Sequence, residues 1–360
     1  MQEAKRLSGA DFLLCIMSGN FVQRGEAAIM DKFTRAKHAI LAGADAVIEL
    51  PTIFATSSAE LFAKGAIHIL SSIPNVTTLC FGAENADKLA FISAARYLND
   101  EPQEVSQKIK ELVSGGISYA KARAQAWAGF IPIELLCSSN NILGLEYTKA
   151  ILAYDANIDI LPIPRIGNGY NDSTLHENYS SATAIRAAIE QGAEITNNLP
   201  PFVLADLPSE LEDTLDPLEK YAVHAKSAQD IAKVCDCTEG LENALKKAAE
   251  DSAPLAEKLT SARYTASRIR RIALQNLLNI EEGLIRECLQ SPLYLRVLAA
   301  KKERIEILSE LSKSSFPVIA RAHDEDLLCD QAQKSYSIDL FADKIHHLLY
   351  KIAENKNIFI

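Results

Sequence analysis

Two apolar runs decide the fold of this chain: Phe12-Leu13-Leu14-Cys15-Ile16-Met17 and Ala46-Val47-Ile48-Glu49-Leu50. Each is short, continuous and apolar, which is typical of a strand buried inside a parallel sheet. Between the two runs, Asp31 can cap a helix that ends at Gly43. A strand, a helix and a second strand in this order predict an α/β unit with parallel strands.

The same alternation continues to about residue 192. Helical spacing covers residues 59–70, 87–98 and 144–154, and strands are expected at residues 76–81 and 158–163. We therefore expect residues 1–195 to form a Rossmann-like, doubly wound parallel sheet. Residues 197–201 break the pattern, and residues 218–234, 241–249 and 284–311 then show helical spacing. Residues 196–360 are accordingly expected to form a second, mainly helical domain.

The beginning of the printed sequence is unusual for such a sheet. Residues 2–7 followed by Ser8-Gly9 resemble the last turns of a helix with its glycine stop, and no strand precedes them. The first strand of a doubly wound sheet is normally central, so its absence would leave unpaired backbone on both neighbouring strands. The sequence thus predicts an amino-terminally truncated chain that lacks a first strand, a turn and a helix start.

Composition limits the class of protein. The 360 residues are 48% hydrophobic and 23% charged, which predicts a soluble globular protein of about two domains. No apolar run reaches the ~20 residues of a membrane span and no secretion signal is present, so we expect a cytoplasmic location. Seven scattered cysteines favour buried free thiols, and no metal site is expected. The net charge of −10 argues against unselective nucleic-acid binding, although a local basic patch could hold RNA.

The segment Ser180-Ser181-Ala182-Thr183-Ala184-Ile185-Arg186 points most directly to a ligand. The free N–H groups and positive dipole end of a helix start attract anions. The hydroxyls of Ser180, Ser181 and Thr183 add donors, and Arg186 adds positive charge. We interpret this segment as the phosphate end of a nucleotide site, while an ordinary capped helix explains the same residues equally well.

A group of cations marks the second half of the chain. No Asp or Glu occurs between Lys258 and Ile280, and the cations there are Lys258, Arg263, Arg268, Arg270 and Arg271. On a helix, Ile269, Ile272, Ala273, Asn276 and Ile280 would share one face, and Tyr264, Arg268 and Arg271 the opposite one. Such a solvent face suits an RNA backbone with a stacking aromatic side chain. A solvated helix whose arginines pair with carboxylates is the alternative.

Several motifs together resemble the bacterial tRNA(Met) cytidine acetate ligases. The signature begins with Met17-Ser18-Gly19-Asn20-Phe21-Val22-Gln23-Arg24-Gly25-Glu26 and Asp31-Lys32-Phe33-Thr34-Arg35-Ala36-Lys37. It continues through Phe81-Gly82-Ala83-Glu84, residues 140–147, Arg165-Ile166-Gly167, residues 180–186 and Arg263-Tyr264-Thr265. Each motif is weak evidence by itself, but the ordered set covers nearly the whole chain.

The resemblance implies a nucleotidyltransferase that activates acetate with ATP. Acetyl-adenylate would form with release of pyrophosphate, and the acetyl group would pass to the wobble cytidine of elongator tRNA(Met), giving N4-acetylcytidine. ATP would bring Mg²⁺, and neither a membrane nor a protein partner is implied. The family's ATP-binding residues correspond to Gly82, Asn141, Arg165, Ile166, Ser180, Ser181, Thr183 and Arg186. Gly19, Asn20, Gln23 and Arg24 would form an acetate or nucleotide loop. The tRNA would contact Arg263, Tyr264, Arg268 and Arg271.

Several alternatives remain beside this interpretation. A helix cap and surface charges are the alternative for Asp31, Lys32 and Arg35, with the cap favoured for Asp31, and without the family resemblance a simple helix cap is favoured for Asn141. Members of the family open with a His-x-Gly-His turn that faces the α-phosphate, and this pattern is absent from the sequence. No catalytic residue is therefore assigned, and adenylate formation is expected to be impaired. The rival functions are an adenylyltransferase acting on a small phosphorylated metabolite and a non-catalytic tRNA-binding protein.

Overall fold

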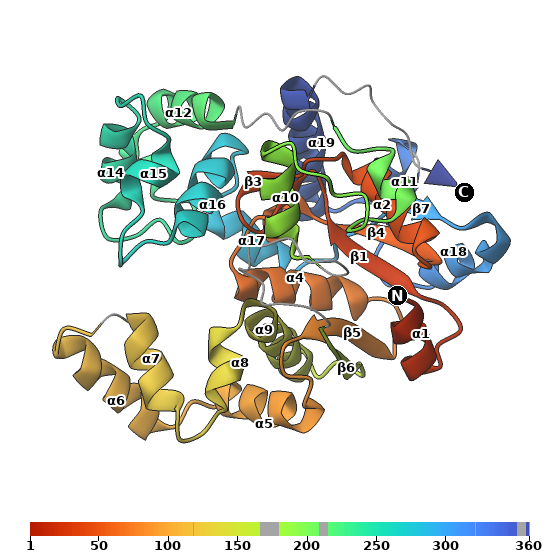
Figure 1. The fold of residues 1–360 in the computed structure, drawn as a ribbon, viewed down its shortest axis with the longest axis horizontal. Helices are drawn as coiled ribbons and strands as arrows, with labels where there is room; N and C mark the ends of the chain where they lie inside the picture. The colour runs from red at the N-terminus through yellow and green to blue at the C-terminus, as the bar shows by residue number, and fades with distance from the viewer. Residues whose placement is uncertain (118, 166–179, 209–214, 321, 351–357, 360) are drawn as a thin grey trace. The chain divides into compact units, whose positions relative to one another are not determined.

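The computed structural model describes residues 1–117, 119–165, 180–208, 215–320, 322–350 and 358–359 (Figure 1). It divides into two compact units. Unit 1 comprises Met1–Lys5, Gly9–Asn75 and Asp206–Ile360, and unit 2 comprises Arg6–Ser8 and Val76–Ala205. The carboxyl-terminal part of the chain therefore belongs to the same compact unit as the first strands. The division of functions between residues 1–195 and 196–360 stays a prediction.

The sheet of unit 1 is mixed rather than purely parallel. Its strands β1 (Leu14–Ser18), β4 (Ala46–Leu50), β7 (Leu295–Ala300) and β8 (Val318–Ile319) lie in the order β1-β4-β7-β8. The pairing of β1 with β4 is parallel, as predicted, whereas β7 runs antiparallel to β4. The strand β9 (Ile358–Phe359) pairs with β7 beside residues 299–300, and β8 pairs at residues 295–296.

The strand β7 corrects the prediction of a helix over residues 284–311. The segment contains the end of α17 (Glu282–Cys288), the strand β7 and then α18 (Glu306–Leu311). All six residues of β7 are buried. A short segment that is apolar all round has no periodicity by which a buried strand could be told from a buried helix. Its secondary structure therefore depends on the tertiary environment, here the pairing with β4 in the sheet.

The helix α2 (Lys32–Leu41) connects β1 to β4 as the sequence predicts. The carboxylate of Asp31 caps it by accepting from the backbone N–H groups of Phe33 and Thr34 at 2.9 and 3.1 Å. Ala36, Ala39 and Ile40 pack this helix against Val47 and Leu298 of the sheet. After β4 follow α3 (Thr52–Ala55) and α4 (Ala59–Leu70), and the bounds of α4 agree with the prediction.

The helices of unit 1 build a second apolar core. They are α12 (Leu215–Ala225), α13 (Ala228–Ile231), α14 (Leu241–Ala248), α15 (Leu255–Leu259) and α16 (Ala266–Leu277). Figure 1 shows α12, α14, α15 and α16 gathered in one group. The predicted apolar face of α16 is confirmed, because Ile269, Ile272, Ala273, Asn276 and Ile280 are fully buried. The long helix α19 (Asp330–Tyr350) completes the unit.

Unit 2 contains a two-stranded parallel sheet covered by helices. The strands are β5 (Thr78–Ala83) and β6 (Asp159–Pro164). The helices are α5 (Lys88–Asn99), α6 (Gln103–Ser114), α7 (Tyr119–Trp127), α8 (Ile133–Cys137), α9 (Ser139–Ala153), α10 (Ala182–Glu190) and α11 (Pro201–Leu204). Gly144 lets α9 approach β5, because a Cβ there would overlap the ring of Phe81.

Strand pairing, cysteines and surface complete the description. Within the described part of the chain, β1 pairs only with β4 and β5 only with β6, and most residues of both strands are half-buried. The cysteines are free, as predicted, but only Cys237 and Cys288 are buried.

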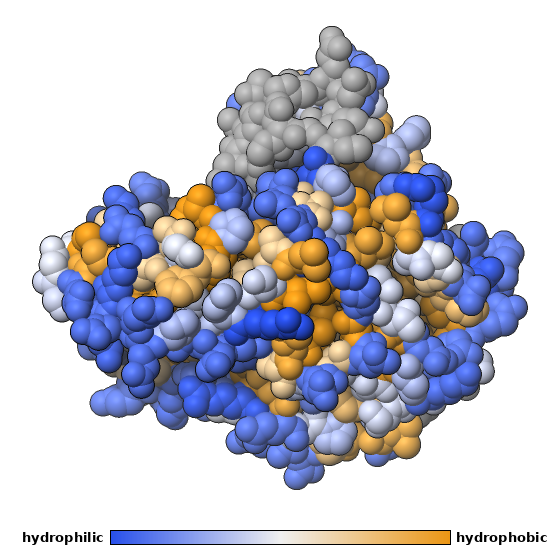
Figure 2. Space-filling model, turned by 90° about the horizontal axis from the view of Figure 1, so that it is seen from below, coloured by the Kyte–Doolittle hydropathy of each residue, from blue (hydrophilic) through white to orange (hydrophobic). Residues whose placement is uncertain are grey.

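Figure 2 shows a mainly hydrophilic face with some apolar surface near its middle. No described helix has the length and apolarity needed to cross a membrane.

Candidate functional site

Two predicted ATP-binding residues meet at the carboxyl ends of β5 and β6 in unit 2. Gly82 lies on β5, and Arg165 directly follows β6, where its N–H donates to the carbonyl of Ala83 at 2.9 Å. A Cβ at Gly82 would lie 3.4 Å from Cγ of Arg165, so the arginine stem crosses the glycine. Both residues are exposed. The arginine stem therefore lies over the backbone of Gly82 at the strand ends, where open α/β sheets bind ligands.

Asn141 is completely buried and positions the loop that follows β5. Its Oδ1 accepts from the N–H groups of Glu84 and Asn85 at 2.9 and 3.2 Å. Its Nδ2 donates to the carbonyl of Glu134 at 3.1 Å. The predicted contact between Asn141 and adenosine stays a prediction, but in this structure the amide is engaged with backbone groups. Its direct effect is to fix the shape of the loop beside Gly82.

Glu84 is a site residue whose contacts the sequence did not predict. One carboxylate oxygen accepts from Asn140 Nδ2 at 2.6 Å, and the other accepts from the N–H of Asn141 at 3.2 Å. Glu84 therefore caps the first turn of α9 from outside, where no side chain of the helix itself serves as cap. Only its position directly after a strand and a glycine could have indicated this role.

The hydroxyl-rich segment forms the start of α10, as predicted. Ser181 is the N-cap, and its Oγ accepts from the N–H of Ala184 at 3.0 Å. Ser180 Oγ accepts from Asn198 Nδ2 at 2.9 Å, and Thr183 and Arg186 are half-buried. A role in binding phosphate stays a prediction, since a capped helix start is common to both interpretations. Ile166 lies outside the described residues.

The predicted acetate or nucleotide loop follows β1 in unit 1. A Cβ at Gly19 would overlap Oε1 of Glu49 on the neighbouring strand, so any other residue there would displace a carboxylate that Lys32 holds at 2.9 Å. Asn20 is buried, and its Nδ2 donates to Asp343 at 2.9 Å while its Oδ1 accepts from the N–H of Lys32 at 2.8 Å. Asn20 thus joins β1, α2 and α19 instead of facing solvent.

Gln23 and Arg24 form the turn between β2 (Phe21–Val22) and β3 (Glu26–Ala27). Both side chains are half-buried. Among the described residues, Nε2 of Gln23 has no hydrogen-bond partner although it is shielded from solvent. A buried amide nitrogen without an acceptor is unusual in a folded protein. Of the four residues predicted in this loop, Gln23 is therefore the one with unused hydrogen-bonding capacity at a defined place.

A buried network of charges lies beneath this loop and corrects the interpretation of Lys32 as a surface charge. Lys32 is 0% exposed, and its Nζ contacts both carboxylate oxygens of Glu49 at 2.8–2.9 Å and Asp343 at 2.7 Å. Arg296 pairs with the same two carboxylates at 3.1 and 3.0 Å. The interruption of an apolar strand by Glu49 was the only signal of this network in the sequence. Full pairing is what makes such burial tolerable.

Arg35 is half-buried rather than a surface charge. Burial lowers the pKa of its guanidinium to about 10, against the opposing effect of Glu49 and Asp31. Its side chain donates to the carbonyl of Gly19. The residue therefore holds the first turn of the predicted loop in place from below.

The predicted tRNA-binding residues cluster at the start of α16, but they are less exposed than predicted. The guanidinium carbons of Arg263 and Arg268 lie 5.7 and 5.2 Å from the ring centroid of Tyr264. Arg268 donates to the carbonyl of Asp236 at 2.7 Å. The side chain of Arg263 is 63% exposed, whereas that of Arg271 is only 17% exposed. The solvent face is therefore limited mainly to Arg263, because Tyr264 and Arg268 are both half-buried.

These cations form ion pairs with carboxylates, which is the alternative to RNA binding that the sequence analysis named. The ion pairs are Arg263–Glu239 at 2.6 Å, Lys258–Asp251 at 2.7 Å, Arg271–Asp236 at 4.0 Å and Arg270–Glu26. RNA binding at this surface stays a prediction, and it would require phosphates to compete with these carboxylates.

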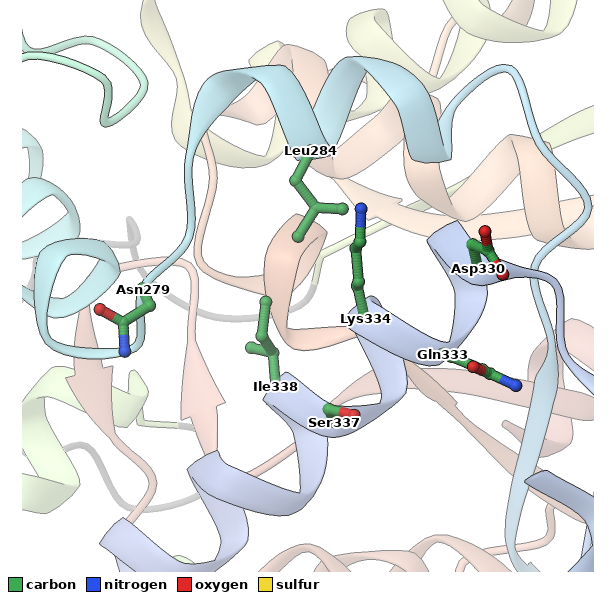
Figure 3. Close-up of a pocket in the computed structure, with 7 residues that line it drawn as sticks. All are labelled: Asn279, Leu284, Asp330, Gln333, Lys334, Ser337 and Ile338. Carbon is green, nitrogen blue, oxygen red and sulfur yellow. The ribbon is translucent and has the colours of Figure 1, made fainter. Parts of the chain in front are cut away.

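One cavity of unit 1 contains none of the predicted residues. It measures about 550 Å³ and lies between α17 and α19. Figure 3 shows Leu284 and Ile338 pointing toward each other, with the side chain of Lys334 extended beside them, while Gln333 and Ser337 turn aside. The described residues contain no group of three His, Cys, Asp or Glu side chains able to hold a metal ion.

Comparison with known proteins gives concordant matches. The model of the HIGH Nucleotidyl Transferase family matches residues 1–358. A tRNA(Met) cytidine acetate ligase of Acetivibrio thermocellus is 35% identical over 98% of this chain and 91% of its own length. The protein of the same name from Caldanaerobacter subterraneus subsp. tengcongensis is 36% identical over the same shares.

Solved structures of Thermotoga maritima TmcAL are also similar to this chain. The apo crystal structure has a TM-score of 0.90 at 27% identity and covers 100% of this chain and 95% of its own. The structure with bound alpha-thio ATP has a TM-score of 0.87 at 27% identity, covering 100% and 94%. The α/β fold with its mixed sheet is therefore shared along the entire chain.

Proposed function

Because the chain belongs to the HIGH nucleotidyltransferase family, we propose that it is an ATP-dependent ligase that acetylates a cytidine of tRNA(Met). The observation that carries this proposal is the match of 98% of the chain to tRNA(Met) cytidine acetate ligases at 35–36% identity. The Thermotoga structure with alpha-thio ATP supports ATP as the activating substrate. A tRNA substrate supports a cytoplasmic location.

The proposed reaction has two steps. A carboxylate oxygen of acetate attacks the α-phosphorus of ATP, which gives acetyl-adenylate and releases pyrophosphate. The N4 amine of the wobble cytidine of elongator tRNA(Met) then attacks the acetyl carbonyl, AMP leaves with the former acetate oxygen, and the amine loses a proton. Phosphoryl transfer of this kind depends mainly on positioning and on neutralising charge, which a protein supplies with fixed donors and cations.

In unit 2, Gly82 and Arg165 are the best-placed residues for the nucleotide. Gly82 has no side chain to block a ligand, and the exposed Arg165, whose stem passes beside Gly82, would supply the positive charge. Asn141 would act by holding the adjoining loop, and the start of α10 would contact the outer phosphates. We expect Mg²⁺ to arrive bound to ATP, because phosphate oxygens and waters are its usual ligands. The residue that assists attack at the α-phosphorus stays unassigned.

The proposal is tested by incubating the full chain with ATP, labelled acetate and an elongator tRNA(Met) transcript. We expect acetate-dependent release of pyrophosphate and one N4-acetylcytidine in the tRNA. Pyrophosphate release that depends on a small phosphate ester instead of acetate would contradict the proposal and support an adenylyltransferase. Binding of tRNA with no acetylation and no pyrophosphate release would contradict it in favour of a non-catalytic protein.

A matched pair of variants tests the role of Arg165. Replacing this exposed arginine by glutamine should reduce acetate-dependent pyrophosphate release by about 10²-fold, the typical effect of losing one charge-stabilising donor. Arg286→Gln is the control, because Arg286 is 73% exposed on α17 and its one ion pair among the described residues is with its helix neighbour Glu282. Equal activity of the two variants would remove Arg165 from the ATP site.

For tRNA binding, Arg263 gives the clearest test. Arg268 and Arg271 also hold the loop at residues 236–239, so their loss would alter the fold locally. Arg263 also pairs with Glu239 of this loop, but that ion pair is solvent-exposed and contributes little to stability, so Arg263→Ala should weaken tRNA binding, flatten its salt dependence and leave ATP affinity unchanged. Unchanged tRNA affinity in a filter-binding assay would exclude this surface.

A further inference from the structure

A second cavity of unit 1 contains a pattern of charges that fits a nucleobase. It measures about 490 Å³, within the ~300–1,000 Å³ typical of small-molecule sites. The β2–β3 hairpin and the helices α12, α15 and α16 enclose it. Its polar lining residues are Glu26, Asp216, Glu219, Glu257, Thr260 and Arg270. Pro254, Ala256 and Ala266 add apolar wall, so the cavity offers both apolar surface and several polar groups.

The β2–β3 hairpin and α16 are in direct contact at one wall of the cavity. Gly25 has a φ of +73°, and a Cβ there would overlap the backbone of Arg270 and Arg271, so the hairpin tip lies directly on the helix. Glu26, the next residue, forms an ion pair with Arg270, and both side chains remain partly exposed at 31% and 42%. A carboxylate and a guanidinium are therefore fixed side by side at the cavity.

This pair matches the edge of cytosine. The base presents its N4 amine, a donor, next to the acceptors N3 and O2, while a carboxylate only accepts and a guanidinium only donates. Uracil has an acceptor in place of N4, which would face the carboxylate of Glu26 without a proton. A phosphate is disfavoured as well, because four carboxylates line the cavity against one guanidinium.

We propose that this cavity binds the cytosine of the tRNA substrate, turned out of its stack, with Glu26 accepting from N4 and Arg270 donating to N3 or O2. Enzymes that modify a base take it out of the stack and read its Watson–Crick edge in such pockets. The assignment rests on the proposed function, and it adds the place and the chemistry of cytidine recognition.

The position of the cavity along the chain supports this assignment. Arg270 and Ala266 line the cavity from α16, and Tyr264 with Arg263 lies just before the first turn of the same helix, where the RNA backbone is proposed to bind. On the other side, Gly25 and Glu26 directly follow the loop proposed for acetate or nucleotide. A simple cation site fits less well, because Arg270 stands at the wall and Asp216 already pairs with Lys220 at 2.7 Å.

The test compares two anticodon stem-loop RNAs of elongator tRNA(Met), one with the wobble cytidine and one with uridine in its place. Their affinities for the full chain are measured by fluorescence anisotropy without ATP or acetate. The unmodified chain should prefer the cytidine RNA by roughly 5- to 150-fold, the discrimination expected of one well-placed pair of contacts. In Glu26→Gln the preference should fall to about threefold or less, because an amide can face either base.

Two further variants keep the test decisive. Glu282→Gln removes the carboxylate of an exposed Glu–Arg ion pair on α17 that does not line the cavity, and it should keep the preference. Thr260→Trp fills the cavity from an exposed position, and it should reduce binding of the cytidine RNA to the level of the uridine RNA.

The outcomes separate this inference from the proposed function. If the unmodified chain acetylates tRNA(Met) but Glu26→Gln and Thr260→Trp retain its preference for cytidine, the base is recognised elsewhere and the inference is overturned. Equal binding of the two RNAs by an active unmodified chain overturns it too. If the unmodified chain acetylates nothing, the proposed function fails, while loss of a binding preference in both cavity variants would still support a cytosine pocket.

Discussion

Replacing Asn141 by alanine should loosen the loop after β5 and thereby weaken ATP binding. The change removes the acceptor of two loop N–H groups and the donor to one carbonyl, at distances of 2.9, 3.2 and 3.1 Å. Each hydrogen bond contributes ~0.5–1.5 kcal/mol net, and the loop is only partly buried, so water can replace some of the loss. We expect the free energy of unfolding to fall by about 2 kcal/mol.

Two measurements test this expectation. Urea unfolding gives the change in the free energy of unfolding, and hydrogen exchange gives the local effect, with protection of the Glu84 and Asn85 amides falling roughly tenfold or more. ATP affinity by calorimetry should fall in parallel. The control is Asn140→Ala, which removes a single bond to Glu84 and should cost under ~1 kcal/mol. Unchanged amide protection in Asn141→Ala would refute the reasoning, because the loop would then keep its shape without this side chain.

Three further substitutions test the frame of unit 1. Gly25→Ala should lower the free energy of unfolding by about 1–3 kcal/mol more than Gly9→Ala does. Both glycines have positive φ, but only a Cβ at Gly25 would overlap the backbone of another segment. Equal losses of the two variants in urea unfolding would contradict this. Lys32→Met should lower the free energy of unfolding by about 3–5 kcal/mol, because it leaves buried carboxylates without their cation. The control Lys64→Met removes only an exposed ion pair within a helix and should lower it by less than ~0.5 kcal/mol. Similar losses in the two variants would show that the buried network is dispensable. Burial, followed by the nearby Glu49, raises the pKa of Asp339 to about 7, so the folded state holds a proton that the unfolded state releases near pH 4. The free energy of unfolding should therefore fall as the pH rises from about 4 to about 7. If Asp339→Asn leaves the slope of this free energy against pH unchanged, Asp339 is not the group responsible.

The elements of the first half of the chain could be predicted because local signals agree there. The strand at residues 46–50 and the helix at residues 59–70 have the predicted bounds, since Pro51 and an apolar period mark them clearly. The strand β7 could not be predicted from its own residues, because it is buried on both faces and lies far along the chain from its partner β4. The compact units likewise depend on contacts across more than 200 residues.

The candidate site was predictable in its members but not in their contacts. Sequence reasoning placed Gly82 and Arg165 at strand ends, and the parallel pairing of β5 with β6 brings them together. It could not show that Asn20 and Asn141 are buried, because an asparagine in a loop has the same local pattern whether its amide faces solvent or a backbone group. The partners of Asn20 come from α2 and α19, and the second lies more than 300 residues away.

The arginines of α16 show why charge along a sequence is a poor guide to charge in space. The interval between Lys258 and Ile280 has no acidic residue, yet Asp236 and Glu239 reach the helix from a neighbouring loop, where both adopt positive φ. An RNA phosphate must therefore displace a carboxylate from each such guanidinium. The displaced carboxylate then attracts a cation from solution, which offsets part of the counterion release that drives RNA binding. Salt should consequently weaken tRNA binding less steeply than a count of these arginines implies, and a slope equal to that count would mean that the ion pairs are already open in solution.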